Sequence, residues 1–343
     1  MVRSVPIGAG SPITVQSMTN TDTRDVEATI LQARRLASAG CDIVRIAIPD
    51  EDAAKALADI RNELDIPLVA DIHFRHKLAL LALEAGIDKL RINPGNIGSA
   101  ERVREVADAA KEHGVPIRVG VNAGSLRKDI LARHGRPSPE ALAESAFEEV
   151  DVLGDAGFEN VCVSIKASNV LNTLKANLLF AEKKNNPLHL GITESGTKTY
   201  GTIKSSCGLG SLLSHGIGDT MRVSLTADPV EEIIVGIAIL KAMGLRQAGP
   251  EIVSCPTCGR TEVDIISLAE EVEKRAASIS EPISIAVMGC VVNGPGEARE
   301  ADYGIAGGKG EGLLFRNGEI VGKIPEDQLI DALFDMIAKD LNS

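Results

Sequence analysis

Eight repeats of one pattern fill residues 13–244 and constrain the fold of this chain more than any other feature. Each repeat has a short run rich in β-branched residues, a polar turn and an amphipathic stretch of ten or more residues. The expected strands cover residues 13–18, 43–48, 68–73, 90–93, 117–122, 161–166, 188–193 and 221–225. Eight strand–helix units in about 245 residues predict a closed (β/α)8 barrel, the TIM barrel. An open doubly wound sheet is the alternative, but its glycine-rich phosphate fingerprint does not follow the first strand.

After Gly249-Pro250 the repeat stops and a smaller α/β module follows. We expect the barrel to cover residues 1–245 and the small module to cover residues 246–343. The elements expected in the small module are a strand at 252–253, a helix at 264–277, a strand at 283–288, a hairpin near 313–324 and a final helix from 326. Residues 246–343 contain 9 Lys and Arg against 17 Asp and Glu, so the acidity of the chain is concentrated there.

Charge and composition exclude several classes of protein. A formal net charge of -12 disfavours a nucleic-acid partner, and the absence of Trp with only 2 Tyr leaves few side chains for base stacking. The longest apolar run, residues 233–240, is too short to span a bilayer and is interrupted by Gly236. Because no secretion signal precedes the first repeat, we expect a cytoplasmic protein whose 6 cysteines are free thiols or metal ligands.

The alternation of side chains along the strands predicts a polar barrel interior. In the strand at 221–225, the apolar residues occupy one face and Arg222 and Ser224 the other, because neighbouring side chains point to opposite faces. The apolar face must pack against the helices, so the polar face lies on the barrel axis. The same reasoning places these side chains inside: Arg45, Asp71, His73, Arg91, Asn93, Arg118, Asn122, Cys162, Ser164, Lys166, His189, Thr193, Arg222 and Ser224.

The positive charge of this interior indicates an anionic ligand. Four Arg and one Lys outnumber the inward acids, and a buried charge without a partner is costly. Internal salt bridges, with Asp71 pairing an arginine, are the alternative. Most of the cations lie at the C-terminal ends of strands, where barrel enzymes have their active sites, and arginine binds phosphate oxygens bidentately. A diphosphate, or two phosphates, fits this set of donors.

The segment after the seventh expected strand adds further donors. It begins at Glu194 and leads through Lys204, Ser205 and Ser206 into an expected helix N-terminus. Backbone N–H groups at such a terminus bind phosphate. We therefore include these residues in the predicted phosphate site.

Three cysteines of the small module have the spacing of a metal site. Cys255-Pro-Thr-Cys258 is followed at a distance by Cys290, which gives three thiolates where zinc and iron–sulfur sites usually have four. Glu297, across a Gly-Pro-Gly turn from Cys290, is the nearest acid on that loop. The small module contains no His, which favours an iron–sulfur cluster over zinc. A redox dithiol is the other alternative, and it leaves Cys290 unexplained.

Motifs in both modules resemble one family. The sequence closely resembles the bacterial 4-hydroxy-3-methylbut-2-enyl-diphosphate synthases in their shorter, two-domain form, and the likeness covers nearly the whole chain. The matching motifs are Val15-Gln-Ser-Met18, Ala70-Asp-Ile-His-Phe74, Arg91-Ile-Asn-Pro-Gly-Asn96, Arg118-Val-Gly-Val-Asn122, Gly191-Ile-Thr-Glu194, Cys255-Pro-Thr-Cys-Gly259 and Val287-Met-Gly-Cys-Val-Val-Asn293.

The resemblance implies a reaction, a cofactor and partners. The reaction is the reductive dehydration, with ring opening, of 2-C-methyl-D-erythritol 2,4-cyclodiphosphate to the linear allylic diphosphate of the non-mevalonate isoprenoid pathway. The family holds a 4Fe-4S cluster with three Cys and one Glu, which match Cys255, Cys258, Cys290 and Glu297 here. The resemblance also implies a head-to-tail homodimer, with the cluster domain of one subunit over the barrel of the other, and flavodoxin or ferredoxin as electron donor.

Roles follow for the predicted site residues. We expect Glu194 to donate a proton to the leaving hydroxyl, although it could instead pair with Lys198 or Lys204. We expect the substrate to bind to Arg45, His73, Arg91, Asn93, Arg118, Asn122, Lys166, Lys204, Ser205, Ser206, Arg222 and Ser224.

Two other functions share part of this pattern. A barrel transferase of the pterin-binding type with a zinc-stabilised tail would be a colourless protein that contains zinc. An electron-carrier module fused to a binding barrel would have a reducible cluster and would leave the cyclodiphosphate unchanged.

Overall fold

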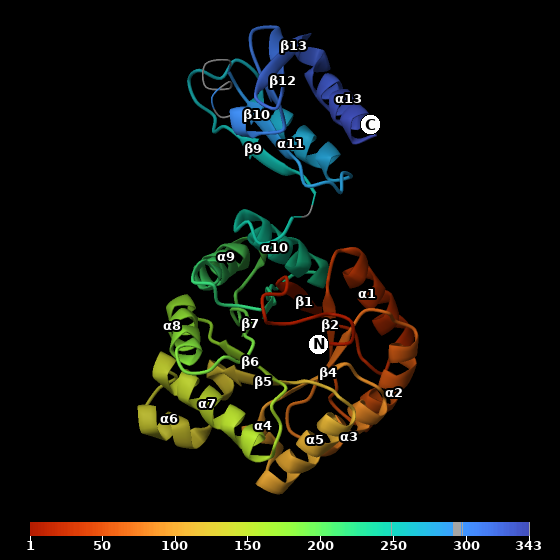
Figure 1. The fold of residues 1–343 in the computed structure, drawn as a ribbon, viewed down its shortest axis with the longest axis vertical. Helices are drawn as coiled ribbons and strands as arrows, with labels where there is room; N and C mark the ends of the chain where they lie inside the picture. The colour runs from red at the N-terminus through yellow and green to blue at the C-terminus, as the bar shows by residue number, and fades with distance from the viewer. Residues whose placement is uncertain (248, 291–295, 297, 343) are drawn as a thin grey trace. The chain divides into compact units, whose positions relative to one another are not determined.

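The structure, a computed structural model, describes every residue except 248, 291–295, 297 and 343 (Figure 1). It divides into two compact units, Met1–Arg246 and Gln247–Ser343. The division falls next to the point where the eightfold repeat ends. No helix in the described ranges is long and apolar enough to cross a membrane.

The first unit is an eight-stranded parallel barrel. Its strands are β1 (Thr14–Met18), β2 (Ile43–Ala47), β3 (Leu68–Asp71), β4 (Lys89–Ile92), β5 (Ile117–Asn122), β6 (Val161–Lys166), β7 (His189–Leu190) and β8 (Thr220–Met221). The hydrogen-bonded order is β6-β5-β4-β3-β2-β1-β8-β7. A parallel bridge between Val163 and Leu188 joins the two ends of that order, so the sheet is closed. The predicted TIM barrel is confirmed, and the open doubly wound sheet is excluded.

Helices follow the strands around the outside of the barrel (Figure 1). Several of them begin after a polar residue whose side chain accepts a hydrogen bond from the first turn, as Asp25 does from Ala28 and Asp228 from Val230. The long helices are α1 (Val26–Ser38), α2 (Glu51–Asn62), α3 (His76–Glu84), α5 (Ala100–Glu112), α7 (Pro139–Asp155), α8 (Val170–Ala181), α9 (Lys198–Ser214) and α10 (Pro229–Ala242). Shorter segments are α4 (Pro94–Ile97), η1 (Ala123–Ser125) and α6 (Lys128–His134).

The apolar core of this unit lies between the strands and the helices. Val44 and Ile46 of β2 and Leu57 and Ile60 of α2 are buried in it, and the same pattern continues around the barrel. Because every second strand residue is used for this layer, the alternate residues point to the axis, and most of those are polar.

The second unit is a five-stranded sheet with two long helices. Its strands, in the order β13-β12-β11-β10-β9, are β9 (Glu251–Ser254), β10 (Ser284–Met288), β11 (Tyr303–Ala306), β12 (Glu311–Arg316) and β13 (Glu319–Pro325). The other elements are α11 (Ile265–Ala276), η2 (Ala298–Glu300), η3 (Glu326–Gln328) and α13 (Leu329–Leu341). Strands β9, β10 and β11 pair in parallel, and β12 and β13 form an antiparallel hairpin. Strand β11 was not expected, because its four residues lie between polar and glycine-rich segments.

Glu149 is a buried carboxyl group in the barrel unit. It lies on α7, which packs against β5 and β6, and it is 1% exposed. Its Oε1 accepts a weak hydrogen bond from the Ser145 hydroxyl at 3.5 Å, and its Oε2 has no partner among the described residues. Burial raises the pKa of Glu149 to about 8.

We expect Glu149→Gln to stabilise the fold near neutral pH. At a pH above the ordinary pKa of glutamate, Glu149 is deprotonated in the unfolded chain but still protonated in the folded chain. Wild-type stability therefore falls as the pH rises toward the folded pKa of about 8. The neutral amide of the variant removes this loss of stability. We therefore expect the Tm of Glu149→Gln to be about 5 °C above that of the wild type near pH 7.5 and nearly equal to it below pH 5. Thermal unfolding at both pH values measures the difference.

Glu148→Gln is the matched control, because Glu148 is the neighbouring residue and pairs with Arg133 at 2.7 Å near the surface. An equal gain in this variant, or a gain from Glu149→Gln that does not depend on pH, contradicts the assignment.

Candidate active site

A cavity of 370 Å³ lies among the C-terminal ends of the barrel strands. Of the twelve predicted substrate-binding residues, these line it: Arg45, His73, Arg91, Arg118, Asn122, Lys166, Arg222 and Ser224. Glu194 lines it as well. The volume is within the usual range for small-ligand sites. The strand alternation placed these eight strand residues on the barrel axis, but it also placed Asn93, Cys162 and His189 there, which do not line the cavity.

Asp71 is a buried acid in the cavity wall. Its Oδ1 accepts from Arg91 Nη1 at 3.2 Å, and its Oδ2 lies 3.8 Å from Arg45 Nε and 3.3 Å from His73 Nε2. Burial alone would raise the pKa of Asp71, but the nearby cationic groups outweigh it and hold this pKa far below the usual range. Asp71 is therefore an anion that partly neutralises two arginines, so the internal salt bridges considered as an alternative account for part of the charge.

Arg118 and Lys166 carry the charge that Asp71 does not neutralise. Arg118 is 1% exposed, and its Nε and Nη2 have no hydrogen-bond partner in the part of the chain that the structure describes. Lys166 is 7% exposed. Burial, reinforced by the other cations of the cavity, lowers the pKa of both groups well below their ordinary values. A bound anion would satisfy these donors and compensate their charge.

Glu194 is exposed at the rim of the cavity, in a left-handed backbone conformation with φ of 50°. This conformation is uncommon for a residue other than glycine and is found at functional sites more than elsewhere. Lys198 pairs with Glu231 at 2.9 Å, and Lys204 donates to the backbone oxygen of Glu194 at 3.5 Å. Neither lysine forms an ion pair with the Glu194 carboxylate among the described residues, so this carboxylate is available to a ligand.

Four predicted substrate residues do not line the cavity. The sequence predicted Lys204, Ser205 and Ser206 at the N-terminus of a helix. Helix α9 instead begins at Lys198, so these three residues lie inside it. Ser205 is buried and donates to the Ser195 hydroxyl at 3.4 Å, which supports the segment that carries Glu194. Asn93 is buried and donates to the carbonyl of Gly120 at 3.4 Å.

The cavity wall includes residues that were not assigned to the site: Asp71, Ala123, Gly124, Ser125, Ser164, Ser168 and Thr193. Asp71, Ser164 and Thr193 have the inward parity of the other site residues, so the strand pattern contained the signal for them. The turn η1 after β5 has no such signal, because its residues follow no strand alternation.

The cysteines of the second unit lie at the ends of neighbouring parallel strands. Cys255 follows β9 and donates its backbone N–H to Val287 of β10 at 3.2 Å, and Cys290 follows β10. The N–H of Gly289 donates to Cys255 Sγ at 3.1 Å. A backbone hydrogen bond from Arg260 and the hydroxyl of Thr261 lower the pKa of Cys258, which favours its thiolate.

These donors fit an iron–sulfur cluster chemically. All three thiols are free, and N–H groups that donate to sulfur stabilise the charge on thiolate ligands. No group of three or more His, Cys, Asp or Glu within the described ranges is gathered closely enough to hold a metal ion. Glu297, the predicted fourth ligand, lies outside the described residues. The fit therefore rests on the donor set and on the common strand edge.

Comparison with known proteins identifies relatives over the full length. Residues 1–237 match the GcpE TIM-barrel domain, and residues 251–339 match the GcpE protein C-terminal domain. A relative from Geobacter sulfurreducens is 58% identical over 99% of this chain and 96% of its own length. One from Clostridium acetobutylicum is 58% identical over 97% of this chain and 95% of its own length. Both are named 4-hydroxy-3-methylbut-2-en-1-yl diphosphate synthase (flavodoxin).

Among solved structures, a dihydropteroate synthase from Yersinia pestis resembles the barrel. It covers 69% of this chain and 94% of its own, with a TM-score of 0.50 and 14% sequence identity. At that identity the likeness concerns the fold alone.

Proposed function

Because the chain belongs to the GcpE family of 4-hydroxy-3-methylbut-2-en-1-yl diphosphate synthases, we propose that its barrel binds 2-C-methyl-D-erythritol 2,4-cyclodiphosphate and that the enzyme converts this ring to the linear allylic diphosphate. The conversion opens the ring at one C–O bond to phosphate and removes one hydroxyl as water. It takes up two electrons, so the chain is an oxidoreductase of the non-mevalonate isoprenoid pathway.

The observation that carries the proposal is the excess of buried positive charge around the cavity. Arg118 and Lys166 are buried there without a carboxylate partner among the described residues, and Arg45 and Arg91 share the single acid Asp71. A cyclic diphosphate carries a compact negative charge of the kind that such a set of donors binds. Asn122 and Ser224 line the same cavity and provide neutral donors for the hydroxyl groups.

Cys255, Cys258, Cys290 and Glu297 would hold the 4Fe-4S cluster. When bound, the cluster supplies the two electrons one at a time. The C-terminal unit offers thiols on one strand edge with N–H groups directed at sulfur, which suits this cofactor. The names of the relatives support flavodoxin as the electron donor of this chain.

Glu194 would supply the proton that the departing hydroxyl needs to leave as water. Its carboxyl lines the cavity, and its left-handed backbone holds it at the rim beside the cationic wall. The cations bind and orient the phosphates, while His73 helps to fix Asp71 and its arginines. We further propose a head-to-tail homodimer, in which the cluster unit of one subunit covers the barrel of the other.

Anaerobic purification with assays for iron, sulfide and zinc tests the cofactor. We expect a coloured protein with about four iron and four sulfide per chain and little zinc. A colourless protein without iron, after anaerobic reconstitution has also failed, contradicts the proposal. A zinc protein would instead favour the transferase with a zinc-stabilised tail.

A further inference from the structure

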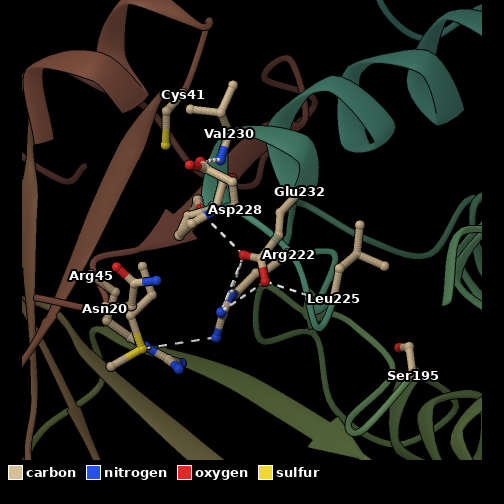
Figure 2. Close-up of polar contacts among 12 residues, drawn as sticks. Asn20, Cys41, Arg45, Ser195, Arg222, Leu225, Asp228, Val230 and Glu232 are labelled. Carbon is tan, nitrogen blue, oxygen red and sulfur yellow. Dashed lines mark hydrogen bonds and ion pairs between the residues drawn. The ribbon is translucent and has the colours of Figure 1, made fainter. Parts of the chain in front are cut away.

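Glu232 is a buried acid on the outer ring of helices that reaches a cavity residue. It lies in the first turn of α10 and is 3% exposed. Its carboxylate accepts two hydrogen bonds from Arg222, from Nε to Oε2 at 3.1 Å and from Nη2 to Oε1 at 3.2 Å (Figure 2). Two parallel hydrogen bonds fix the plane of a guanidinium group as well as its position.

The Glu232 carboxylate is itself held by two further donors. The Ser17 hydroxyl of β1 donates to Oε2 at 3.0 Å, and the backbone N–H of Leu225, which follows β8, donates to Oε1 at 3.0 Å. Each oxygen thus accepts two hydrogen bonds, and the donors come from β1 and from the segment that follows β8. A carboxylate with this many fixed donors has one orientation. Its two hydrogen bonds therefore restrict the Arg222 guanidinium to one orientation as well.

The other edge of Arg222 is left for a ligand. Its Nη1 lies 3.8 Å from the sulfur of Met18, and Nε of Arg45 donates to the same sulfur at 3.0 Å. Thioether sulfur is a weak acceptor, so it separates the two cations without neutralising either. Arg222 and Arg45 both line the cavity.

Repulsion explains why Arg222 needs this support. It shares the cavity with Arg45, Arg91 and other cations, and like charges would drive a flexible arginine toward solvent. The hydrogen-bonded ion pair with Glu232, which does not itself line the cavity, opposes this movement. The sequence gives no hint of it, because an acid in the first turn of a helix is ordinary.

We propose that Glu232 is a positioning residue that holds the Arg222 guanidinium in the orientation required to bind a phosphate of the substrate. The inference rests on the proposed function, since it takes the cyclodiphosphate as the ligand. Ser17 contributes to the same positioning, because its hydroxyl donates to Glu232 Oε2, the oxygen that accepts from Nε of Arg222.

The test measures binding of the cyclodiphosphate by calorimetry to the oxidised, cluster-loaded enzyme without reductant, so that no turnover occurs. Glu232→Gln keeps the shape and removes the charge, and we expect the Kd to rise about tenfold. Glu231→Gln is the matched control, because Glu231 is the adjacent residue, pairs with Lys198 at 2.9 Å and does not line the cavity. Its Kd is expected to equal that of the wild type.

A double-mutant cycle separates positioning from a general structural effect. If Glu232 acts through Arg222, then Glu232→Gln weakens binding no further in an Arg222→Ala background. In steady-state turnover, Glu232→Gln should raise KM while kcat stays within about twofold of the wild type. An unchanged Kd in Glu232→Gln, or an equal loss in both backgrounds, overturns the inference and leaves the proposed function intact.

A second variant covers the case in which Glu232→Gln does not fold. Ser17→Ala removes one hydrogen bond to the carboxylate and keeps the ion pair. It should raise the Kd about two- to threefold in the wild-type background and not at all beside Arg222→Ala. An unchanged Kd in Ser17→Ala would then overturn the inference. If the wild type itself does not bind the cyclodiphosphate, the proposed function fails and the inference fails with it.

Discussion

Glu194→Gln is expected to lower kcat by about 10²- to 10⁴-fold, the usual range for loss of a general acid. The amide keeps the size and hydrogen-bonding shape of the side chain but cannot deliver the proton that the departing hydroxyl requires. Because Glu194 lies at the rim and forms no ion pair among the described residues, we expect KM and the cluster spectrum to change little. Reductant-supported turnover under anaerobic conditions measures kcat.

Glu182→Gln provides the control for this experiment. Glu182 is an exposed residue at the end of α8 that does not line the cavity, and its substitution should leave turnover unchanged. Turnover close to that of the wild type in Glu194→Gln would remove Glu194 from the mechanism. A lost cluster spectrum would assign it a role in assembly.

Arg118→Met is expected to weaken substrate binding about 100-fold or more and, at the same time, to stabilise the protein without substrate. A charged hydrogen bond to phosphate contributes roughly 1.5–3 kcal/mol. Two buried nitrogens of Arg118, Nε and Nη2, have no partner among the described residues and can donate to it. In the free protein the same buried charge is a cost, so an apolar side chain of similar length relieves it. We expect a Tm higher by several degrees and a Kd too weak to measure at ordinary concentrations.

Opposite signs for the two effects distinguish a ligand-binding cation from a structural one. If Arg118→Met lowers the Tm, a group in the free protein already compensates the charge, and the argument from unpaired burial fails. If affinity is unchanged, Arg118 is not a ligand residue. Arg104→Met, an exposed position on α5, controls for the general effect of removing an arginine and should change neither quantity.

Much of the fold could be predicted because the barrel repeats one physical unit. Strands β5 and β6 have the predicted bounds, since their alternation runs unbroken for six residues each. Strands β7 and β8 are two residues long where six and five were expected. Side chains beyond the ends of these strands, such as Thr193 and Ser224, still face the cavity. The alternation of inward and outward side chains therefore continues past the hydrogen-bonded part of each strand.

The limits of the site prediction have separate causes. Alternation along strands finds inward side chains, and it therefore found Arg118 and Lys166 but could not find Glu232, which reaches inward from a helix. It also says nothing about where a helix begins, so Lys204 was placed at a terminus that lies at Lys198. Strand β11 was missed because it has only four residues, which lie between polar and glycine-rich segments.

The most direct test of the central claim follows the phosphorus signals of 2-C-methyl-D-erythritol 2,4-cyclodiphosphate by NMR. The enzyme is purified anaerobically, shown to contain iron and sulfide, and supplied with reduced flavodoxin. We predict that the two phosphorus signals of the ring disappear and those of a linear diphosphate monoester replace them, with two electrons consumed per molecule. An enzyme with a reducible cluster that leaves the ring unchanged would contradict the account and would favour an electron carrier fused to a binding barrel.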